Sequence, residues 1–426
     1  MFLIVLVFFF LVVEKPYYKT EIKEKLATFQ GALKSTIFIG QCFGLNPVIG
    51  AGDIDPAKLR FKLFSARCIY SILSIIGQAI MCSISILNVI AWSDTSLQSL
   101  IPVVFNSSNC ITTILFFRLA IKWPKLCQYI GRIEAVNPNI DGAFISKCNL
   151  SCVIVLTLAL VEHILSDLSK IISVVDCHPN KNKYGAFIMS SFPWIFTFLD
   201  YNDFLGVCSQ VINIQCTFNW NFSNLFVICV SIYLTSRFDQ VNKKILAVKG
   251  KVVPTNFWRN VREEYNRTIN MVRRVNDVIG GIIFISYTNN LFFICVQLFY
   301  TLSEGISAIP SCHPESHDQR PLKGYEQAVY FMYSFSFLVV RSLVVSLVAS
   351  RVHSASKEPA YALYDIPPAM YCVEVRRFLD QIHSDTVAMS GFNYFQIKRG
   401  LVLTIAGTIV TYELVLLQFG STPDAK

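Results

Sequence analysis

The chain is poor in charged residues. Only 15% of its 426 residues are Asp, Glu, Lys or Arg, against about 25% in soluble domains. In their place, 53% of the residues are hydrophobic. Several apolar stretches run for about 20 residues, which is enough to cross a bilayer core of about 30 Å as a helix. The shortage of charge therefore excludes an ordinary soluble globule and predicts an all-α, polytopic membrane protein.

Motifs for catalysis and for cofactor binding are also missing. The sequence contains no GxSxG, P-loop, HExxH or paired CxxC pattern. The segment from Cys312 to His317 combines Cys, His and Glu but lacks a fourth ligand of clear spacing, so an ordinary loop is the preferred interpretation. We therefore predict no enzymatic activity, no metal site and no cofactor.

Low-complexity segments and internal repeats are absent as well, which weakly disfavours a transporter built from inverted halves. The net charge of +9 does not indicate nucleic-acid binding. The basic residues lie between the apolar runs, where they report membrane orientation.

Seven long apolar runs predict seven transmembrane helices. These runs lie at residues 68–92, 98–121, 148–172, 204–236, 276–301, 327–350 and 399–419. Residues 31–51 and 186–200 are apolar but interrupted, and we expect them to lie at the membrane without spanning it. The first 13 residues are too short for a span and lack the features of a signal peptide, so we expect an interfacial segment.

The distribution of Lys and Arg predicts the orientation. Alternate segments on one side carry nine, five, ten and six of these residues, which makes 30. The segments on the other side carry none, three, two and one, which makes six. The positive-inside rule then places the N-terminus in the cytoplasm and the C-terminus outside. A G-protein-coupled receptor has the opposite orientation.

Two of the basic segments show helical patterns. Residues 237–275 look like two charged helices broken near Gly250–Pro254, and residues 370–390 place apolar side chains near helical spacing. The spaced residues of the second segment are Val373, Phe378, Ile382 and Val387. We expect these helices to extend runs 4 to 7 into the cytoplasm and to pack together.

Polar residues gather in the outer halves of runs 2 to 6, with Asn106, Ser107 and Ser108 in run 2. A neutral polyol needs this mixture, because amides and carboxylates bind hydroxyls while aromatic faces cover apolar C–H surface. Taken singly, each residue fits an interhelical hydrogen bond equally well, but together they predict a pocket open to the outside. The candidate ligand-binding residues are Glu162, His163, Asp203, Gln210, Trp220, Asn290, Gln297, Tyr330 and Ser334.

Arg341 is a charged residue inside an apolar run. It lies in the inner half of run 6 and is expected to snorkel to the cytoplasmic face or to pair with a carboxylate.

Cys177 and Cys312 are the only cysteines in predicted outer loops, where a disulfide can form. We predict that they pair, with two free thiols as the alternative.

The last run, residues 400–419, carries a patterned set of polar groups. Thr411, Val415 and Gln418 fall on one helix face with Phe419 at its edge, and Glu413 points to the opposite side. Polar groups in a membrane helix face protein or water. The pattern leaves two interpretations open, hydrogen bonding between helices and a helix that lines an aqueous path.

The segment Thr411–Phe419 resembles the Thr-Tyr, five residues, Gln-Phe signature that closes the last helix of insect gustatory receptors. Glu413 departs from it, because an apolar residue is typical there. Other stretches resemble the sugar-receptor branch of that family, from about residue 28 to the end of the chain. They are Gln41–Val48, Leu59–Phe61 with Ser65–Arg67, Phe117–Ala120 with Trp123–Pro124, Phe218–Phe222, Ser231–Leu234 with Arg237–Phe238, and Asn290–Leu298.

The resemblance implies a ligand-gated, non-selective cation channel in the plasma membrane, assembled as a homo- or heterotetramer with related receptors and surrounded by membrane lipid. Its ligand would be an extracellular mono- or disaccharide. Val415 and Phe419 would form the pore constriction, Gln418 would hydrogen-bond between subunits, and Thr411 and Tyr412 would pack the pore helix. The alternatives are a seven-helix G-protein-coupled receptor and a membrane transporter.

The resulting division of the chain has seven parts. They are a cytoplasmic N-terminal segment (1–67), helices 1–4 with the outer ligand pocket (68–236), cytoplasmic extensions of helices 4 and 5 (237–275), helices 5–6 (276–350), cytoplasmic anchor helices (351–398), the pore-lining helix 7 (399–419) and an extracellular tail (420–426).

Overall fold

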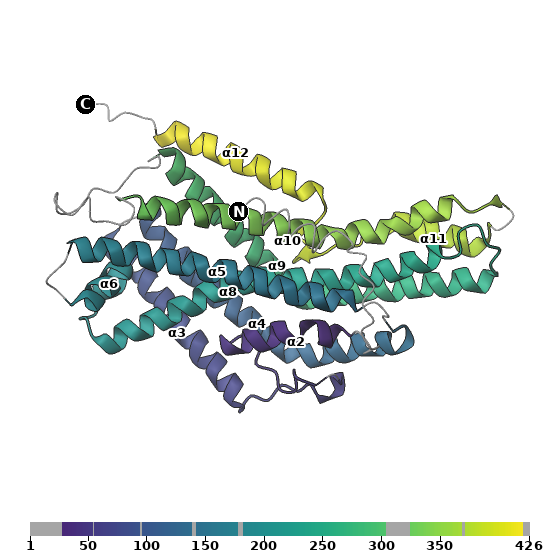
Figure 1. The fold of residues 1–426 in the computed structure, drawn as a ribbon, viewed down its shortest axis with the longest axis horizontal. Helices are drawn as coiled ribbons and strands as arrows, with labels where there is room; N and C mark the ends of the chain where they lie inside the picture. The colour runs from purple at the N-terminus through teal and green to yellow at the C-terminus, as the bar shows by residue number, and fades with distance from the viewer. Residues whose placement is uncertain are drawn as a thin grey trace.

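The computed structural model describes residues 28–53, 55–93, 96–138, 142–177, 182–303, 324–368 and 371–420. These residues are mostly helical (Figure 1). The helices are α2 (Phe29–Cys42), η1 (Pro56–Lys58), α3 (Ala66–Trp92), α4 (Leu97–Val136), α5 (Ala143–Cys177), α6 (Lys183–Ser191), α7 (Pro193–Phe196), α8 (Asp203–Leu246), α9 (Thr255–Ser303), α10 (Glu326–Tyr364), α11 (Val373–Ser384) and α12 (Gly400–Gly420). The strands are β1 (Ser390–Gly391) and β2 (Phe395–Gln396).

Helix α8 forms the centre of an elongated bundle. It contacts α10, α5, α9, α4 and α2, and the long helices α5, α8 and α10 run side by side along the molecule (Figure 1). Every residue from 221 to 235 is buried. A helix buried on all sides has no solvent-facing stripe. This explains why run 4 shows no amphipathic pattern although it carries Asn, Ser and Thr among its apolar residues.

Five of the helices in the described ranges are long and apolar enough to cross a membrane. They are α3, α4, α5, α9 and α10. Helices α8 and α12 coincide with the other two predicted runs but are not among the five. The apolar run of α8 is interrupted by amides such as Gln210, Gln215 and Asn219. The protein is therefore a multi-pass membrane protein, and the count of seven spans stays a prediction.

The two stretches that were not expected to span form short helices. Residues 31–51 fall largely in α2, whose side chains pack in the main core, and residues 186–200 form parts of α6 and α7. Thr28 caps α2 by accepting a hydrogen bond from the Gly31 backbone N–H.

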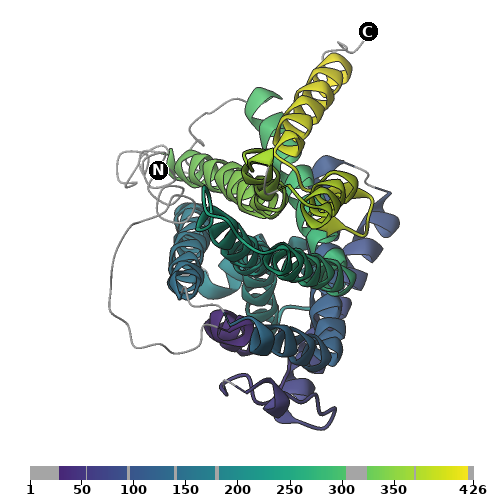
Figure 2. The same cartoon turned by 90° about the vertical axis from the view of Figure 1, so that its right-hand side faces the viewer.

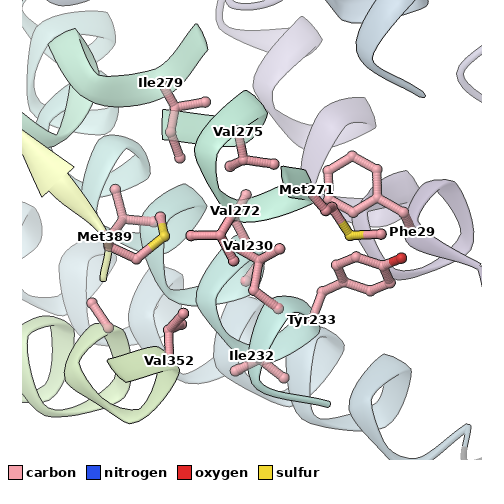
Figure 3. Close-up of a cluster of buried hydrophobic side chains, with 14 of the residues drawn as sticks. Phe29, Val230, Ile232, Tyr233, Met271, Val272, Val275, Ile279, Val352 and Met389 are labelled. Carbon is pink, nitrogen blue, oxygen red and sulfur yellow. The ribbon is translucent and has the colours of Figure 1, made fainter. Parts of the chain in front are cut away.

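The ends of α9 and α10 pack with α11, and α8 packs with α9 and α10. Residues 237–275 and 370–390 are largely helical, as their patterns predict. The helical pattern breaks between Leu246 and Thr255. Figure 3 shows the core beside this region, where Tyr233 of α8, Val272 of α9, Val352 of α10 and Met389 lie together. Two details of the prediction were wrong. Val373 is 65% exposed, because α11 turns Val375 into the core together with Phe378 and Ile382. Val387 is buried, but it lies beyond the end of α11 at Ser384.

An ion pair ties α11 to α9. Arg262 Nε lies 3.0 Å from Glu374 Oε2, and Arg377 lies 2.9 Å from the other carboxylate oxygen. The hydrogen bond from Arg262 lowers the pKa of the Glu374 carboxyl. The contact fixes the first third of α9 to the segment that precedes β1.

The sequence did not predict the small hairpin β1–β2. Ser390 pairs with Gln396 and Gly391 with Phe395 in antiparallel register. The turn places Phe392 and Asn393 at positive φ. The hairpin packs on α9 at Gly280 and Gly281, where an added Cβ would come within 3.2 Å of Phe392 N and 2.8 Å of Phe392 Cζ. The hairpin thus lies on a glycine seat of α9 just before α12 begins.

Candidate ligand site and the exposed terminal helix

Three helices meet through a chain of polar side chains. Gln297 Nε2 of α9 donates a hydrogen bond to Ser334 Oγ of α10 at 3.1 Å. Ser334 Oγ in turn donates to Glu162 Oε1 of α5 at 2.6 Å. Tyr330 lies one helical turn before Ser334 and interacts with Ser334 and Glu162. Four of the predicted ligand residues therefore lie together.

A second polar group lies between α8 and α9. Trp220 Nε1 donates to Asn290 Oδ1 at 3.2 Å, and Asn290 Nδ2 donates to Asn224 Oδ1 at 2.8 Å. Ser286 also donates to Asn224, at 2.9 Å. The Trp220 ring packs against Phe293, with the ring centroids 4.7 Å apart. This arrangement combines amide groups with aromatic faces, as the predicted pocket requires.

Arg341 joins the two groups. It is 3% exposed, and its guanidinium lies 4.6 Å from the centroid of the Trp220 ring and 5.1 Å from that of Phe337. Arg341 Nη1 donates a hydrogen bond to Asn221 Oδ1, and the guanidinium interacts electrostatically with Glu162. No ion pair of Arg341 with a carboxylate is formed in the described part of the chain, so that expectation stays a prediction. The alternative of snorkelling was wrong, because the guanidinium is buried among aromatic rings inside the bundle.

The remaining predicted residues lie in two other places. His163 Nε2 and Gln210 Nε2 both lie near Asp167 Oδ2, at 3.5 Å and 3.3 Å. Asp203 is exposed at the start of α8, where it accepts a hydrogen bond from the Tyr201 hydroxyl at 2.7 Å. The Gln210–Asp167 contact bridges α8 and α5, whereas His163 and Asp167 lie on the same helix. Asp203 lies apart from both polar groups described above.

In the two polar groups that Arg341 joins, two buried polar atoms have no partner in the described part of the chain. Gln297 Oε1 has no hydrogen-bond donor, and Arg341 Nε has no acceptor. A buried polar group without a partner costs about 1–3 kcal/mol. A hydroxylated ligand carries both a donor and an acceptor, so it is chemically suited to such atoms.

A further polar network, which was not predicted from the sequence, lies between α3, α4 and α8. Gln78 donates to Ser74 at 3.2 Å and accepts from Thr113 at 2.8 Å, and Asn219 donates to Thr113 at 2.9 Å. Ser74 also donates to Gln215 at 2.9 Å. The spacing of Ser74 and Gln78, four residues apart on one face of α3, was the available signal.

Helix α12 contacts α9 and α10 but projects away from the bundle (Figure 2). Leu401, Ile405 and Ile409 pack against the bundle. Other apolar side chains are uncovered: Leu403 is 77% exposed, Val410 58% and Val415 42%. Thr411 Oγ1 donates to the Gly407 carbonyl at 2.9 Å. The side chains of Glu413, Gln418 and Phe419 lie outside the description. An apolar helix with so little cover within one chain needs lipid or another subunit around it.

Cys177, the last residue of α5, is disulfide-bonded. Its predicted partner, Cys312, lies outside the described residues, so the pairing of these two cysteines stays a prediction.

The matching family model and the related proteins point to the same family. A family model described as "Trehalose receptor" matches residues 13–426. The Drosophila melanogaster "Gustatory receptor for sugar taste 64f" is 31% identical over 402 residues, covering 93% of this chain and 82% of that protein. The Drosophila melanogaster "Gustatory receptor 5a for trehalose" is 30% identical over 400 residues, covering 92% and 85% of the two chains.

A solved structure shares the fold. The insect olfactory receptor OR5 from Machilis hrabei in complex with eugenol superposes with a TM-score of 0.63 at 14% identity, over 91% of this chain and 97% of that chain. The family model covers nearly the whole sequence, and the described sugar-taste relatives align over most of it. The chain therefore belongs to the trehalose-receptor family, the sugar-receptor branch of the insect gustatory receptors, and is a receptor rather than an enzyme.

Proposed function

We propose that the protein is a sugar-gated, non-selective cation channel of the plasma membrane, with a cytoplasmic N-terminus. The observation that carries the proposal is the chain from Gln297 through Ser334 to Glu162, which links α9, α10 and α5. Trp220 and Asn290 supply an aromatic face and an amide beside it. The names of the relatives, which specify sugar taste and trehalose, support a mono- or disaccharide as the ligand.

Sugar binding would exchange contacts between helices for contacts with the ligand. The hydroxyls of a sugar can take the hydrogen bonds that Ser334 and Gln297 now make to each other and to Glu162. Such an exchange moves α5, α9 and α10 relative to one another. The sugar shifts the channel toward the open state only by its preference for the open arrangement of these helices.

The pore is proposed to lie between the α12 helices of four subunits. The support is the uncovered apolar surface of α12 in one chain, together with the Thr411–Phe419 signature. Val415 and Phe419 would form a hydrophobic constriction that closes by dewetting. Gln418 would hydrogen-bond between neighbouring subunits, and the packed region of α8–α11 would anchor the tetramer.

Substitution of Glu162 by glutamine is expected to raise the half-maximal sugar concentration at least tenfold. Glutamine keeps the shape of the side chain but loses the charge, and a hydrogen bond to a charged group contributes about 1.5–3 kcal/mol. The measurement is whole-cell current in cells that lack endogenous receptors, with a panel of mono- and disaccharides. The matched control is Asp200→Asn, an exposed carboxylate outside the polar groups.

Three results would contradict this proposal. One is an unchanged dose response of the Glu162→Gln channel. Another is a current that requires a G protein, or an N-terminal epitope labelled in intact cells, since either favours a G-protein-coupled receptor. The third is uptake of labelled sugar without current, which is the behaviour of a transporter.

A polar residue at the constriction is expected to open the pore without sugar. In Val415→Ser the hydroxyl would hold water where the valine excludes it, so the closed state conducts. The readout is basal current normalised to surface expression. Leu414→Ser serves as the control, because it places the same polar group on a neighbouring face of α12. Wild-type basal current in a well-expressed Val415→Ser channel would remove Val415 from the gate.

A further inference from the structure

A cavity of about 300 Å³ lies where α4, α9 and the β1–β2 hairpin meet. Arg118 and Lys122 of α4, Asn276 and Asp277 of α9, and Asn393 of the hairpin line it. None of the residues assigned above to the sugar site or the pore constriction belongs to its lining. The cavity is therefore a separate feature of the described part of the chain.

Charged groups at this cavity have no protein partner. Arg118 and Lys122 are one turn apart and share a face of α4, and Asp277 comes from α9. All three are exposed, and in the described ranges none of them forms a hydrogen bond or an ion pair. The lining thus offers two positive charges and one negative charge to a ligand.

The rest of the lining is partly apolar and partly occupied in holding the hairpin. Leu115, Ile282 and Phe392 supply the apolar part. Asn276 Nδ2 donates to the Ala388 carbonyl at 2.7 Å and its Oδ1 accepts from Ser390 N at 3.4 Å, so this amide fixes the entry to the hairpin. A ligand here would touch charged groups at one side and hydrocarbon at the other.

The sequence places this cavity at one membrane surface. Arg118 and Lys122 lie at the end of the run 98–121, Asn276 and Asp277 open the run 276–301, and Lys398 and Arg399 precede α12. In the proposed orientation this is the cytoplasmic surface, where anionic phospholipid headgroups lie. Basic pockets between helices on that side are suited to lipid headgroups.

We propose that the cavity binds the headgroup of an anionic aminophospholipid of the phosphoserine type. Such a headgroup carries two negative groups, a phosphate and a carboxylate, and one ammonium. Arg118 and Lys122 would bind the two anions, Asp277 would accept from the ammonium, and Leu115 and Phe392 would contact the start of the acyl chains. The charge pattern of the lining complements all three groups.

Binding would also stabilise the packing of the β1–β2 hairpin on the glycine seat of α9, just before the pore helix α12. Phe392 lines the cavity and packs on Gly281 of α9, and β2 ends four residues before α12 begins. A bound headgroup that contacts both α4 and the hairpin favours the arrangement in which the hairpin stays on α9. The two arrangements differ in whether the hairpin stays on α9 or is lifted from it. The lipid biases the position of α12 by binding one of them more tightly than the other.

The test measures lipid retention by native mass spectrometry on the purified full-length protein. It compares phosphatidylserine, phosphatidylglycerol and phosphatidylcholine at equal concentration. Wild type is expected to retain phosphatidylserine best. Arg118→Gln and Lys122→Gln should each weaken its retention about fivefold, the factor that corresponds to about 1 kcal/mol per basic residue. Asp277→Asn should remove the preference for phosphatidylserine over phosphatidylglycerol.

Lys125→Gln is the matched control, an exposed basic residue of α4 outside the cavity, and should retain lipid as wild type does. Equal losses in Lys125→Gln and Lys122→Gln would overturn the proposal, since they would indicate only general attraction to the membrane. Displacement of the lipid by millimolar O-phosphoserine would also overturn it in favour of a soluble phosphate ligand. Because retention is measured without sugar or current, its outcome is independent of the proposed channel function.

Discussion

Replacing Arg341 with alanine is expected to lower the free energy of unfolding by about 3–5 kcal/mol. The guanidinium is 3% exposed and stacks on Trp220 and Phe337. Its removal takes away the donor to Asn221, a fully buried amide, and the positive charge that faces Glu162. We expect a clearly lower unfolding temperature of the purified protein and a loss of surface expression.

Two companion variants sharpen this result. Arg341→Lys keeps the charge, but an ammonium cannot stack on two rings and reach Asn221 in the same way, so it should recover only part of the stability. Arg377→Ala removes an exposed arginine that pairs with Glu374 and should change stability little. Wild-type unfolding behaviour of Arg341→Ala would show that the buried guanidinium does not hold α8 and α10 together.

The second large effect is expected at Gly391. A Cβ at this position would lie 2.7 Å from Phe395 Cε1 and Cζ, and 3.2 Å from the backbone Cα of Phe284 on α9. Overpacking of this kind costs about 1–3 kcal/mol, and the hairpin can relieve it by displacing the Phe395 ring or by rising from the α9 backbone. We expect Gly391→Ala to reduce the current at saturating sugar more than tenfold at unchanged surface expression.

The explanation is steric and can be tested as such. In the double variant Gly391→Ala with Phe395→Leu, a shorter side chain replaces the ring that the new methyl group meets. Part of the current should then return. Gly52→Ala is the control, because no heavy atom lies within 4 Å of its added Cβ. A normal current in Gly391→Ala would mean that the hairpin does not need its close seat on α9 for the pore to open.

Helix positions were largely predictable from the sequence, because they depend on local patterns. The run 68–92 corresponds to α3 (Ala66–Trp92), and the break near Gly250 separates α8 from α9. The hairpin was not predictable. Its two-residue strands have no alternating pattern, and they depend on Gly280 and Gly281, which are more than 100 residues away in the chain.

The candidate site was predictable in its composition but not in its pairing. The rotation of each helix about its axis decides which polar groups meet, and that rotation is set by packing across the whole bundle. Ser334 therefore meets Glu162 and Gln297, while Asp203 points elsewhere. Arg341 had two expected fates from the sequence, and only the neighbouring rings of Trp220 and Phe337 exclude snorkelling.

The glycine seat on α9 has a mechanical consequence. With 49 residues, α9 is a rod about 74 Å long, and it carries Gln297 near one end and Arg262 near the other. A glycine pair is the weakest point of such a rod under bending, and Gly280 and Gly281 lie between those two contacts. The hairpin packs over this pair and limits bending there. The tightness of that packing therefore determines how rigidly the two halves of α9 move together.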